Sequence, residues 1–378
     1  MSGRPVESRP RLSDRQRLHW LRLIRTPNVG PATFRDLVNR YGSAEAALEI
    51  LPELVISGGG GRPPRIPTLN DAEREMNEAA RCGARFTCIG DGDYPAMLRQ
   101  MDHPPPVVAV KGVAAVFDLP AVAIVGARNA SLAGLKMARM LAADLGREGL
   151  AIISGLARGI DAAAHEGALA TGTVGVFAGG LDRPYPPENV ELAARIAAGG
   201  GAILSEMPFG WEPRAQDFPR RNRLVAGLSL GLVVVEAAQR SGSLISARLA
   251  GEMGRLVFAV PGSPLDPRAA GANGLLKDGA ILVTEAADVS AALAPLLGHG
   301  QAVRPKLEEP PDFTGAPPPG DSDRERVIEA LGTTPVSVDE IIRHTGLHPA
   351  QVFMVLLELD LAGRLERHSG GTVSIVFA

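Results

Sequence analysis

The feature that most constrains this chain is a repeat of short apolar runs, glycine turns and amphipathic segments over residues 121–180. Two runs rich in Val, Ile and Ala, at residues 121–125 and 151–154, each lead into a glycine turn. Residues 132–145 and 160–170 carry apolar side chains at helical spacing. Short buried strands that alternate with helices are typical of βαβ units and a parallel sheet. The stretch therefore predicts a doubly wound α/β fold, in which ligands bind beyond the carboxyl ends of the strands, where the strand order switches.

The same alternation continues on both sides of this stretch and predicts a central domain over residues 80–298. Further apolar runs indicate strands, and segments with helical spacing lie between them. The additional strands are expected at residues 86–89, 107–110, 202–204, 232–235, 256–260 and 281–283. The additional helices are expected near residues 94–101, 188–198, 218–229, 242–253 and 286–296.

Three glycine turns are expected at the ligand edge of this sheet, and each contains or follows an arginine. They lie in the segments VGARNAS, SGLARGID and EAAQRSGSLISA. Small residues let the backbone approach a phosphate closely, and the free N–H groups of a helix N-terminus attract its negative charge. The candidate nucleic-acid-binding residues of these turns are Gly126, Arg128, Gly155, Arg158, Arg240, Ser241 and Gly242.

An arginine trio in the segment QDFPRRNRLVAGLS is the second candidate. Pro219 suits the first turn of a helix, so Arg220, Arg221 and Arg223 fall where the helix dipole is already positive. An exposed cation is disfavoured there by about 0.3–1 kcal/mol, which makes sense if a polyanion binds these groups. The alternative is internal pairing, and we expect at least one of the three arginines to be structural. The nearby carboxylates are Asp182, Glu206, Glu212 and Asp217.

Three aromatic residues flank the trio in a chain whose aromatic content is only 4%. An exposed Phe209 or Trp211 would stack a base, which contributes about 1–3 kcal/mol. The alternative for all three is core packing, which we expect for Phe218. With the glycine turns and the trio, these residues predict an electropositive groove of phosphate size.

No catalytic residue is predicted. Asp161 and His165 lie four residues apart on a predicted helix, and we interpret them as hydrogen-bonding groups that fasten this helix. A catalytic dyad would also need a positioned nucleophile. Glu236 ends a predicted strand as a lone carboxylate, and we expect it to orient the arginines.

Several function classes are not supported by the sequence. GARNAS lacks the G-x-G-x-x-G of a dinucleotide site, and no Walker lysine or metal-ligand cluster is seen, so neither a cofactor nor a metal is predicted. Cys82 and Cys88 match no common zinc or redox spacing and indicate a reducing, cytoplasmic setting. The absence of a long apolar run or a signal-peptide core argues against membrane insertion and export. The net charge is −3, so any nucleic-acid contact must come from a local patch.

A small helical domain is predicted over residues 1–75. Its segment TPNVGPATFRDLVNRYGS is typical of two short helices joined at residues 28–31, as in SAM or helix-hairpin-helix domains. Such a turn either offers backbone N–H groups to a phosphate or simply connects two helices. Residues 57–67 form a loop by composition.

A proline-rich linker at residues 299–321 and a winged helix at residues 322–378 complete the chain. Six prolines fall between residues 301 and 320 and favour an extended tether. Three helices are expected at residues 323–331, 338–345 and 349–362, followed by a hairpin of residues 365–368 and 372–376 around Gly370 and Gly371.

The third helix of this winged helix is poorly suited to duplex DNA. It has no Lys or Arg between Pro349 and Gly363, and residues 322–378 hold five arginines against eight carboxylates, a net charge of −3. Because attraction to phosphates supplies most non-specific DNA affinity, we expect a protein-contact or regulatory role.

The motifs described above resemble those of the DNA-processing protein A (DprA/Smf) family of bacteria. The segments VGARNAS, SGLARGIDAAAHEGAL, LDRPYPPEN, LSEMPFG, FPRRNRLVAGLS, VVEAAQRSGSLISARLA, AVPGSPLDP and GANGLLKDGA occur in family order over about residues 80–285. The resemblance implies an extended Rossmann-like, dimeric central domain with no established catalytic activity. It also implies a cytoplasmic protein that binds and protects single-stranded DNA in natural transformation and helps load RecA.

The resemblance implies DNA contacts at Arg128 and at the FPRRNR arginines. One family contact is a basic residue just before FP-x-RN, where this chain has Arg214, which is not adjacent to Phe218. The alternative function is a Rossmann-like enzyme that binds or processes nucleoside phosphates, because fold alone does not fix function.

Overall fold

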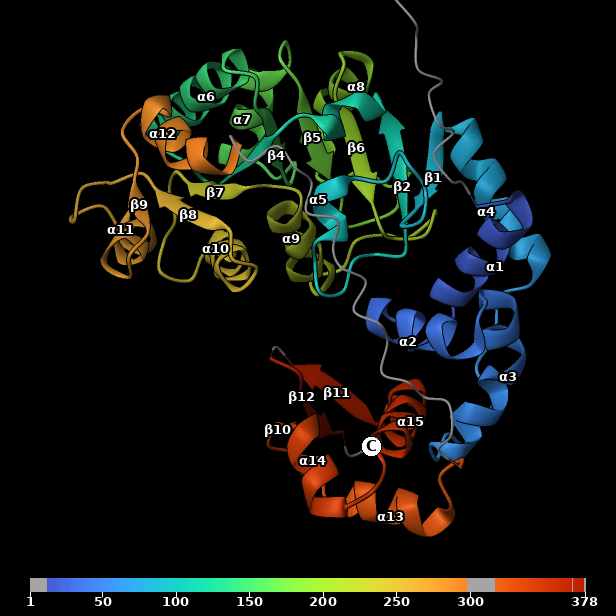
Figure 1. Cartoon of the computed structure of the whole chain (residues 1–378). Coiled ribbons are helices and arrows are strands. Elements are labelled where there is room, and N and C mark those ends of the chain that lie inside the picture. The colour runs from blue at the N-terminus through green and yellow to red at the C-terminus, as the bar shows by residue number, and fades with distance from the viewer. Residues whose placement is uncertain (1–11, 298–316, 369, 377–378) are drawn as a thin grey trace, which may run out of the picture. The chain divides into compact units, whose positions relative to one another are not determined.

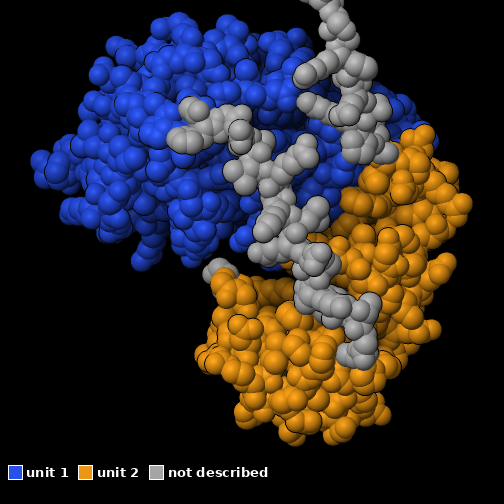
Figure 2. Space-filling view, in the orientation of Figure 1, with its two compact units in different colours: residues 1–11, 74–302 blue, residues 12–73, 303–378 orange. Residues whose placement is uncertain are grey.

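The structure is a computed structural model that describes residues 12–297, 317–368 and 370–376 (Figure 1). The chain divides into two compact units, coloured separately in Figure 2. Unit 1 contains residues 74–302, and unit 2 combines residues 12–73 with residues 303–378. The two ends of the described chain therefore belong to the same unit. The predicted linker lies largely outside the described residues, and the predicted domain limits stay predictions.

Within the described part of unit 1, a nine-stranded sheet has the order β1-β2-β6-β5-β4-β3-β7-β8-β9. The strands are β1 (Ala84–Cys88), β2 (Val107–Gly112), β3 (Ala121–Val125), β4 (Ala151–Ser154), β5 (Thr173–Val176), β6 (Ala202–Ser205), β7 (Gly231–Val234), β8 (Leu256–Ala259) and β9 (Ile281–Leu282). All pairings from β6 through β9 are parallel, whereas β2 is antiparallel to both β1 and β6. The Rossmann-like class is confirmed, with an antiparallel pair added at one edge.

The strand order switches between β3 and β7. From β3 the chain proceeds through β4 and β5 to β6 on one side, and then crosses to β7, β8 and β9 on the other side. The register pairs Val125 with Val234, so the carboxyl ends of the two central strands lie side by side. In doubly wound sheets this is the position of the ligand crevice.

Helices cover both faces of the sheet (Figure 1). Those of one face are α6 (Leu132–Arg147), α7 (Ile160–Ala168) and α12 (Ala286–Leu297), and α8 (Val190–Ala198) packs beside α7. Those of the other face are α5 (Ala96–Arg99), α9 (Asp217–Gly227), α10 (Gly242–Glu252) and α11 (Ala270–Lys277). The side chains of β3 alternate accordingly, because Val122 and Ile124 join the core cluster under α6 while Ala123 and Val125 join the cluster under α9. Two 3₁₀ segments, η1 (Ala114–Asp118) and η2 (Pro187–Asn189), lie in the connections.

Unit 2 contains the N-terminal helices and the winged helix. The helices are α1 (Asp14–Ile24), α2 (Pro31–Tyr41), α3 (Ala44–Ser57), α13 (Asp321–Glu329), α14 (Val338–Thr345) and α15 (Pro349–Leu361), and α4 (Leu69–Arg81) spans the boundary between the units. The strands are β10 (Val336–Ser337), β11 (Leu365–His368) and β12 (Thr372–Ile375), in the order β10-β12-β11. The winged helix is confirmed. Its short β10 was not predicted, because two residues carry no periodicity.

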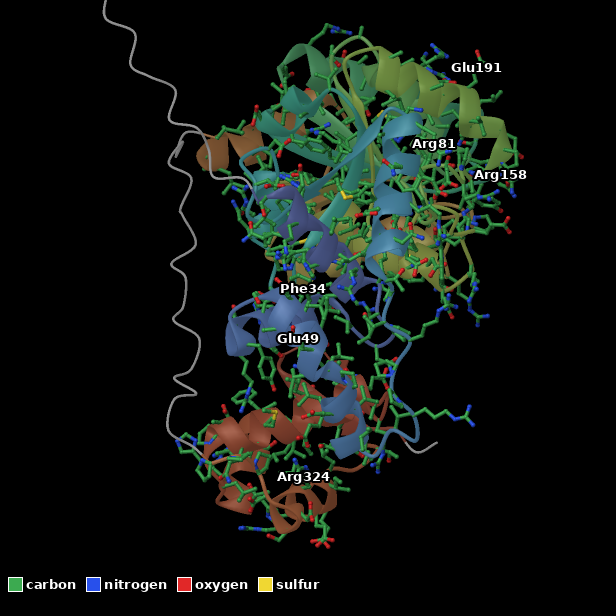
Figure 3. All side chains as sticks on the ribbon, turned by 90° about the vertical axis from the view of Figure 1, so that its right-hand side faces the viewer. Phe34, Glu49, Arg81, Arg158, Glu191 and Arg324 are labelled. Carbon is green, nitrogen blue, oxygen red and sulfur yellow. The ribbon has the colours of Figure 1, made fainter. Side chains whose placement is uncertain are left out.

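The third helix of the winged helix, α15, packs against α2 and α3. Met354, Leu357 and Leu361 belong to the same core cluster as Phe34 and Leu37 of α2. Figure 3 labels Phe34 on its ribbon. Much of the apolar surface of α15 is therefore buried inside unit 2.

Polar contacts fix the same interface. Asn28 donates from its side-chain amide to the Leu361 carbonyl at 3.0 Å, and Thr33 donates to Asp360 at 2.8 Å. A Cβ on Gly58 would lie 2.0 Å from the Glu358 carbonyl oxygen, so only glycine permits this approach. Asn28 belongs to the predicted hairpin turn, whose side chain thus contacts protein.

A candidate single-strand site at the switch point

A cavity of about 730 Å³ lies at the carboxyl ends of β3 and β7. Its wall is formed by the turns after these strands, by the loop before α7, by α9 and by the start of α10. Among the described lining residues, four are arginines and one is a carboxylate: Arg128, Arg221, Arg240, Arg268 and Asp161. The predicted ligand edge and the observed cavity therefore coincide.

Arg128 and Arg240 are the two arginines of this wall that are exposed and form no ion pair in the described chain. Arg128 instead lies over the ring of Phe218, with 5.3 Å between its Cζ atom and the ring centroid. An exposed guanidinium without an internal carboxylate keeps its hydrogen-bonding capacity for an anion.

The N-terminus of α10 adds partial positive charge to the same wall. Ser241 caps the helix by accepting a hydrogen bond from the Ser243 N–H, and Gly242 begins it. No acidic residue occupies the first turn, and nothing within 4 Å would meet a Cβ on Gly242. Because helix N-termini favour anions, this end is available to a phosphate.

Arg221 is buried, with only 6% of its surface exposed, at the base of the site. A Cβ on Gly155 would lie 1.5 Å from Arg221 Nη1, so this glycine makes room for the guanidinium. Burial lowers the pKa of Arg221 to about 10, and the attraction of Asp161 opposes this shift. The guanidinium therefore keeps its charge at neutral pH. Its Nε atom has no hydrogen-bond partner among the described residues.

The charge of Asp161 attracts Arg221, although the two side chains form no direct ion pair in the described chain. The Asp161 carboxylate accepts hydrogen bonds from the backbone N–H groups of Gly155 at 3.1 Å and Ala157 at 3.3 Å. Burial raises the pKa of Asp161, while Arg221 and the two N–H groups act in the opposite direction. The carboxylate of Asp161 therefore stabilises the turn between β4 and α7.

The other two arginines of the trio lie outside the cavity wall. Arg223 is hydrogen-bonded to Glu206, which follows β6, and Arg220 pairs with the same carboxylate at 3.5 Å. Glu206 is one of the partners that the sequence offered. Of the three arginines expected to meet at this edge, Arg221 alone lines the described cavity wall. The DNA contacts of Arg220 and Arg223 stay a prediction.

Arg158 also lies away from the cavity wall. It forms an ion pair with Glu188 at 3.4 Å, with 54% of its side chain exposed. Figure 3 shows it at the outer margin of unit 1. Its role in DNA binding is likewise a prediction.

Two glycines have tasks other than approach to a phosphate. Gly155 accommodates Arg221, and a Cβ on Gly126 would lie 2.7 Å from Ile160 Cγ1 and 2.9 Å from the Glu236 carbonyl. Gly126 thus lets the turn after β3 pack onto α7. Both positions still shape the cavity, because the turns that line it depend on them.

Glu236 hydrogen-bonds to a serine rather than to an arginine, and its role in orienting the arginines stays a prediction. Its carboxylate accepts hydrogen bonds from the Ser131 N–H at 2.9 Å and from the Ser131 hydroxyl. Ser131 in turn caps α6 by accepting from the Gly134 N–H. The strand-end carboxylate therefore fastens the start of α6.

His165 and Asp161 fasten α7 through separate partners. His165 Nδ1 lies 2.7 Å from the Thr173 hydroxyl on β5, whereas Asp161 bonds to backbone N–H groups. Burial lowers the pKa of His165 to about 3, and the charge of Arg221 acts in the same direction. The imidazole is neutral at pH 7 and lies in the core.

The aromatic prediction is corrected at Phe218. We expected core packing there, but Phe218 is half-buried and lines the cavity. Phe209 instead packs on Phe86, with ring centroids 5.9 Å apart. Trp211 donates from Nε1 to Asp217 at 2.9 Å and lies under Arg214. Of the three flanking aromatic residues, Phe218 is therefore the one on the cavity wall.

Sequence analysis missed Arg268, which lies in the loop after β8. It lines the cavity and forms an ion pair with Asp266 at 2.8 Å. The available signal was topological, because β8 neighbours β7 and ends at the same sheet edge.

The described residues contain neither a membrane-spanning helix nor a metal-binding cluster. No helix among them is both long and apolar enough to cross a membrane. No group of three or more His, Cys, Asp or Glu side chains in residues 12–297, 317–368 and 370–376 has an arrangement that would hold a metal ion.

Three family models match consecutive parts of the chain. Residues 14–78 match the DprA-like N-terminal HHH domain, and residues 310–371 match the DprA winged helix domain. Residues 85–294, more than half of the chain, match the DNA recombination-mediator protein A model.

Whole proteins agree with these matches. Protein Smf of Synechocystis sp. is 31% identical, and the alignment covers 95% of this chain and 98% of the relative. The crystal structure of DNA processing protein A from Streptococcus pneumoniae has a TM-score of 0.60 at 33% identity, covering 75% of this chain and 98% of that one. The Helicobacter pylori protein, studied for its single-stranded DNA binding mode, has a TM-score of 0.51 at 30% identity, covering 56% and 96%. The chain belongs to the DNA recombination-mediator protein A family.

Proposed function

We propose that this chain binds single-stranded DNA at the switch-point cavity, protects it, and helps load the RecA recombinase on it during natural transformation. The observation that carries the proposal is a pair of exposed arginines, Arg128 and Arg240, which form no ion pair with a described residue and lie beside the N-terminus of α10. The single-stranded DNA binding mode of the Helicobacter pylori relative supports the same ligand.

The size and lining of the cavity favour an unpaired strand. A volume of about 730 Å³ falls within the range of about 300–1,000 Å³ that small-molecule sites occupy. A nucleotide belongs to this size class, whereas a duplex does not. Phe218 lines the cavity beneath Arg128, and contact with an aromatic ring requires a base that is not paired inside a helix.

The partners follow from the same proposal. Arg128 and Arg240 bind successive phosphates, and the chain acts as a homodimer through unit 1 in the cytoplasm. To load RecA, the protein must release the bound strand to the recombinase. Electrostatic contacts at an exposed edge allow this release, because salt ions and other ligands readily replace them.

The alternative, an enzyme that processes nucleoside phosphates, has weaker support. Such an enzyme needs a general acid or base within reach of its substrate. Asp161 is the carboxylate on the described cavity wall, and its Oδ2 atom already accepts hydrogen bonds from two backbone N–H groups. We therefore propose no catalytic activity.

Binding of a dT oligonucleotide against salt concentration tests the function. A strand binder loses affinity with a log–log slope of about −0.7 for each phosphate contact. A nucleotide-processing enzyme releases base or phosphate from a mononucleotide and needs no long strand. Salt-insensitive binding together with such a release would reject the proposal.

Loading of RecA has its own test. The full chain should shorten the lag of RecA ATP hydrolysis on single strands that carry single-strand-binding protein. A variant with Arg128→Ala and Arg240→Ala should lose this effect, because it no longer holds the strand. An unchanged lag with the wild-type chain would remove RecA loading and leave strand binding in place.

A further inference from the structure

Tyr185 is an exposed aromatic residue beside the cavity, with 48% of its surface accessible. The other two tyrosines of the chain are less exposed, since Tyr94 is 3% exposed and Tyr41 is half-buried. Single exposed apolar side chains are common and need no explanation by themselves. The exposure of Tyr185 is informative because its ring contacts Phe218 on the cavity wall.

The ring of Tyr185 touches the ring of Phe218, with centroids 5.6 Å apart and planes at 60°. Phe218 lines the cavity and also lies under Arg128. Arg128, Phe218 and Tyr185 therefore form a continuous series of planar groups. The series leads from the cavity wall to a tyrosine that is open to solvent.

The backbone that carries Tyr185 is held on both sides. Before it, the Gly180 N–H donates to the Trp211 carbonyl at 3.0 Å. After it, the Asn189 side-chain amide donates to the carbonyls of Leu156 at 2.8 Å and Ala157 at 3.0 Å. Tyr185 is also flanked by Pro184 and Pro186. Because prolines restrict the backbone, little conformational freedom remains to be lost when a ligand binds.

We propose that Tyr185 stacks the base next to the nucleotide that occupies the cavity, and so forms a second base subsite. This inference rests on the proposed strand binding. A ring held at the mouth of a cationic cavity meets the base that follows along the strand. Stacking on it tolerates any sequence, because every base has a π-face. The phosphate between the two bases falls near Arg128.

The test compares two ligands of equal length, a dT oligonucleotide and the same backbone with abasic residues. Tyr185→Ala should weaken dT binding about 5- to 150-fold and leave abasic-strand binding unchanged. Tyr185→Phe keeps the ring and should bind dT within about 2-fold of wild type. Leu119→Ala is the matched control, because Leu119 is also exposed but precedes β3 and so lies at the opposite sheet edge.

Each outcome bears on the assignment. Equal losses for both ligands would mean that Tyr185 acts on structure or on the backbone, and unchanged dT binding would mean that it contacts no base. Either result overturns the inference while wild-type binding stands. A wild-type chain that binds neither ligand removes the proposed function itself.

Discussion

The cavity edge of unit 1 and helix α15 of unit 2 occupy the positions where their folds commonly meet nucleic acid, yet their charges are used in opposite ways. At the cavity edge, Arg128 and Arg240 remain exposed without a carboxylate partner in the described chain. On α15, Asp360 and Glu358 are neutralised by Arg367 at 2.9 Å and Arg324 at 2.8 Å.

The two regions also differ in how far they are buried. The cavity is open to a ligand, whereas α15 is covered by α2 and α3 through a shared apolar cluster. A fold position that can bind DNA does so only if its charges and surface are left free. The comparison therefore favours the sheet edge over the winged-helix position as the proposed site of strand binding.

The largest expected effect comes from reversing the open charges of the cavity. Arg128→Glu with Arg240→Glu should lower affinity for a dT oligonucleotide about 1,000-fold, or about 4 kcal/mol, because attraction to phosphates becomes repulsion. Fluorescence anisotropy at fixed salt measures the change.

The control for this reversal uses two exposed arginines of α6 that already have partners. Arg139 and Arg147 pair with Glu166 and Asp144, and their reversal changes net charge by the same amount. An equal loss in Arg139→Glu with Arg147→Glu would mean that overall charge, not the cavity, governs binding.

The next effect concerns the covered helix. Leu357→Ala removes a side chain that is 2% exposed and should lower the free energy of unfolding of unit 2 by about 3 kcal/mol. Because α2, α3 and α15 share this cluster, amide exchange should accelerate in all three helices, while strand affinity stays unchanged. Ile56→Ala, at an exposed site of α3, serves as the control. Protection that falls in α15 alone would mean that the interface does not couple these helices.

Acid should lower the stability of unit 1 through His165. The pKa of His165 falls from 6.5 in the unfolded chain to about 3 in the folded one. A neutral buried histidine favours folding above pH 6.5, and this contribution is lost as pH falls from 6.5 toward 3. Between pH 6.5 and pH 5 unit 1 should lose about 2 kcal/mol. Exchange measured at both pH values on wild type and His165→Gln checks this, since the variant should lack the dependence in unit 1.

The smallest expected effect concerns the space that Gly155 leaves for the Arg221 guanidinium. Gly155→Ala places a Cβ where the guanidinium lies, so the side chain must move, at a cost of about 1–2 kcal/mol in stability. Weaker strand binding should accompany it. Gly251→Ala in α10 has open space around its Cβ and should be neutral or slightly stabilising. Equal stability of the two variants in urea would contradict the packing role of Gly155.

The sheet was predictable because its central strands are uniform apolar runs that lead into glycine turns. β3 and β4 have the predicted limits, since both are fully buried and their ends are marked. The antiparallel pairing of β2 was not predicted, because a strand covered on both faces reads the same in either direction. Direction is decided by its neighbour β6, far away in sequence.

The candidate site was predictable as an edge and not as a set of contacts. Arg128 and Arg240 were found because turns after parallel strands meet at one edge. The difference between Arg221 and its neighbours Arg220 and Arg223 depends on which face of α9 is buried and on the reach of Glu206. The packing of α15 on α2 was equally out of reach, because matching two apolar faces requires their shapes.

The hydrogen bond between Asn28 and Leu361 joins residues 333 positions apart. A ribosome must therefore synthesise all of unit 1 before the partners of α2 and α3 emerge. The growing chain completes the nine-stranded sheet first, and the apolar cluster of unit 2 closes only after α15 has been synthesised. Until then α2 and α3 expose the surface that α15 later covers, which makes this half-built core the place where a nascent chain most needs protection from misassembly.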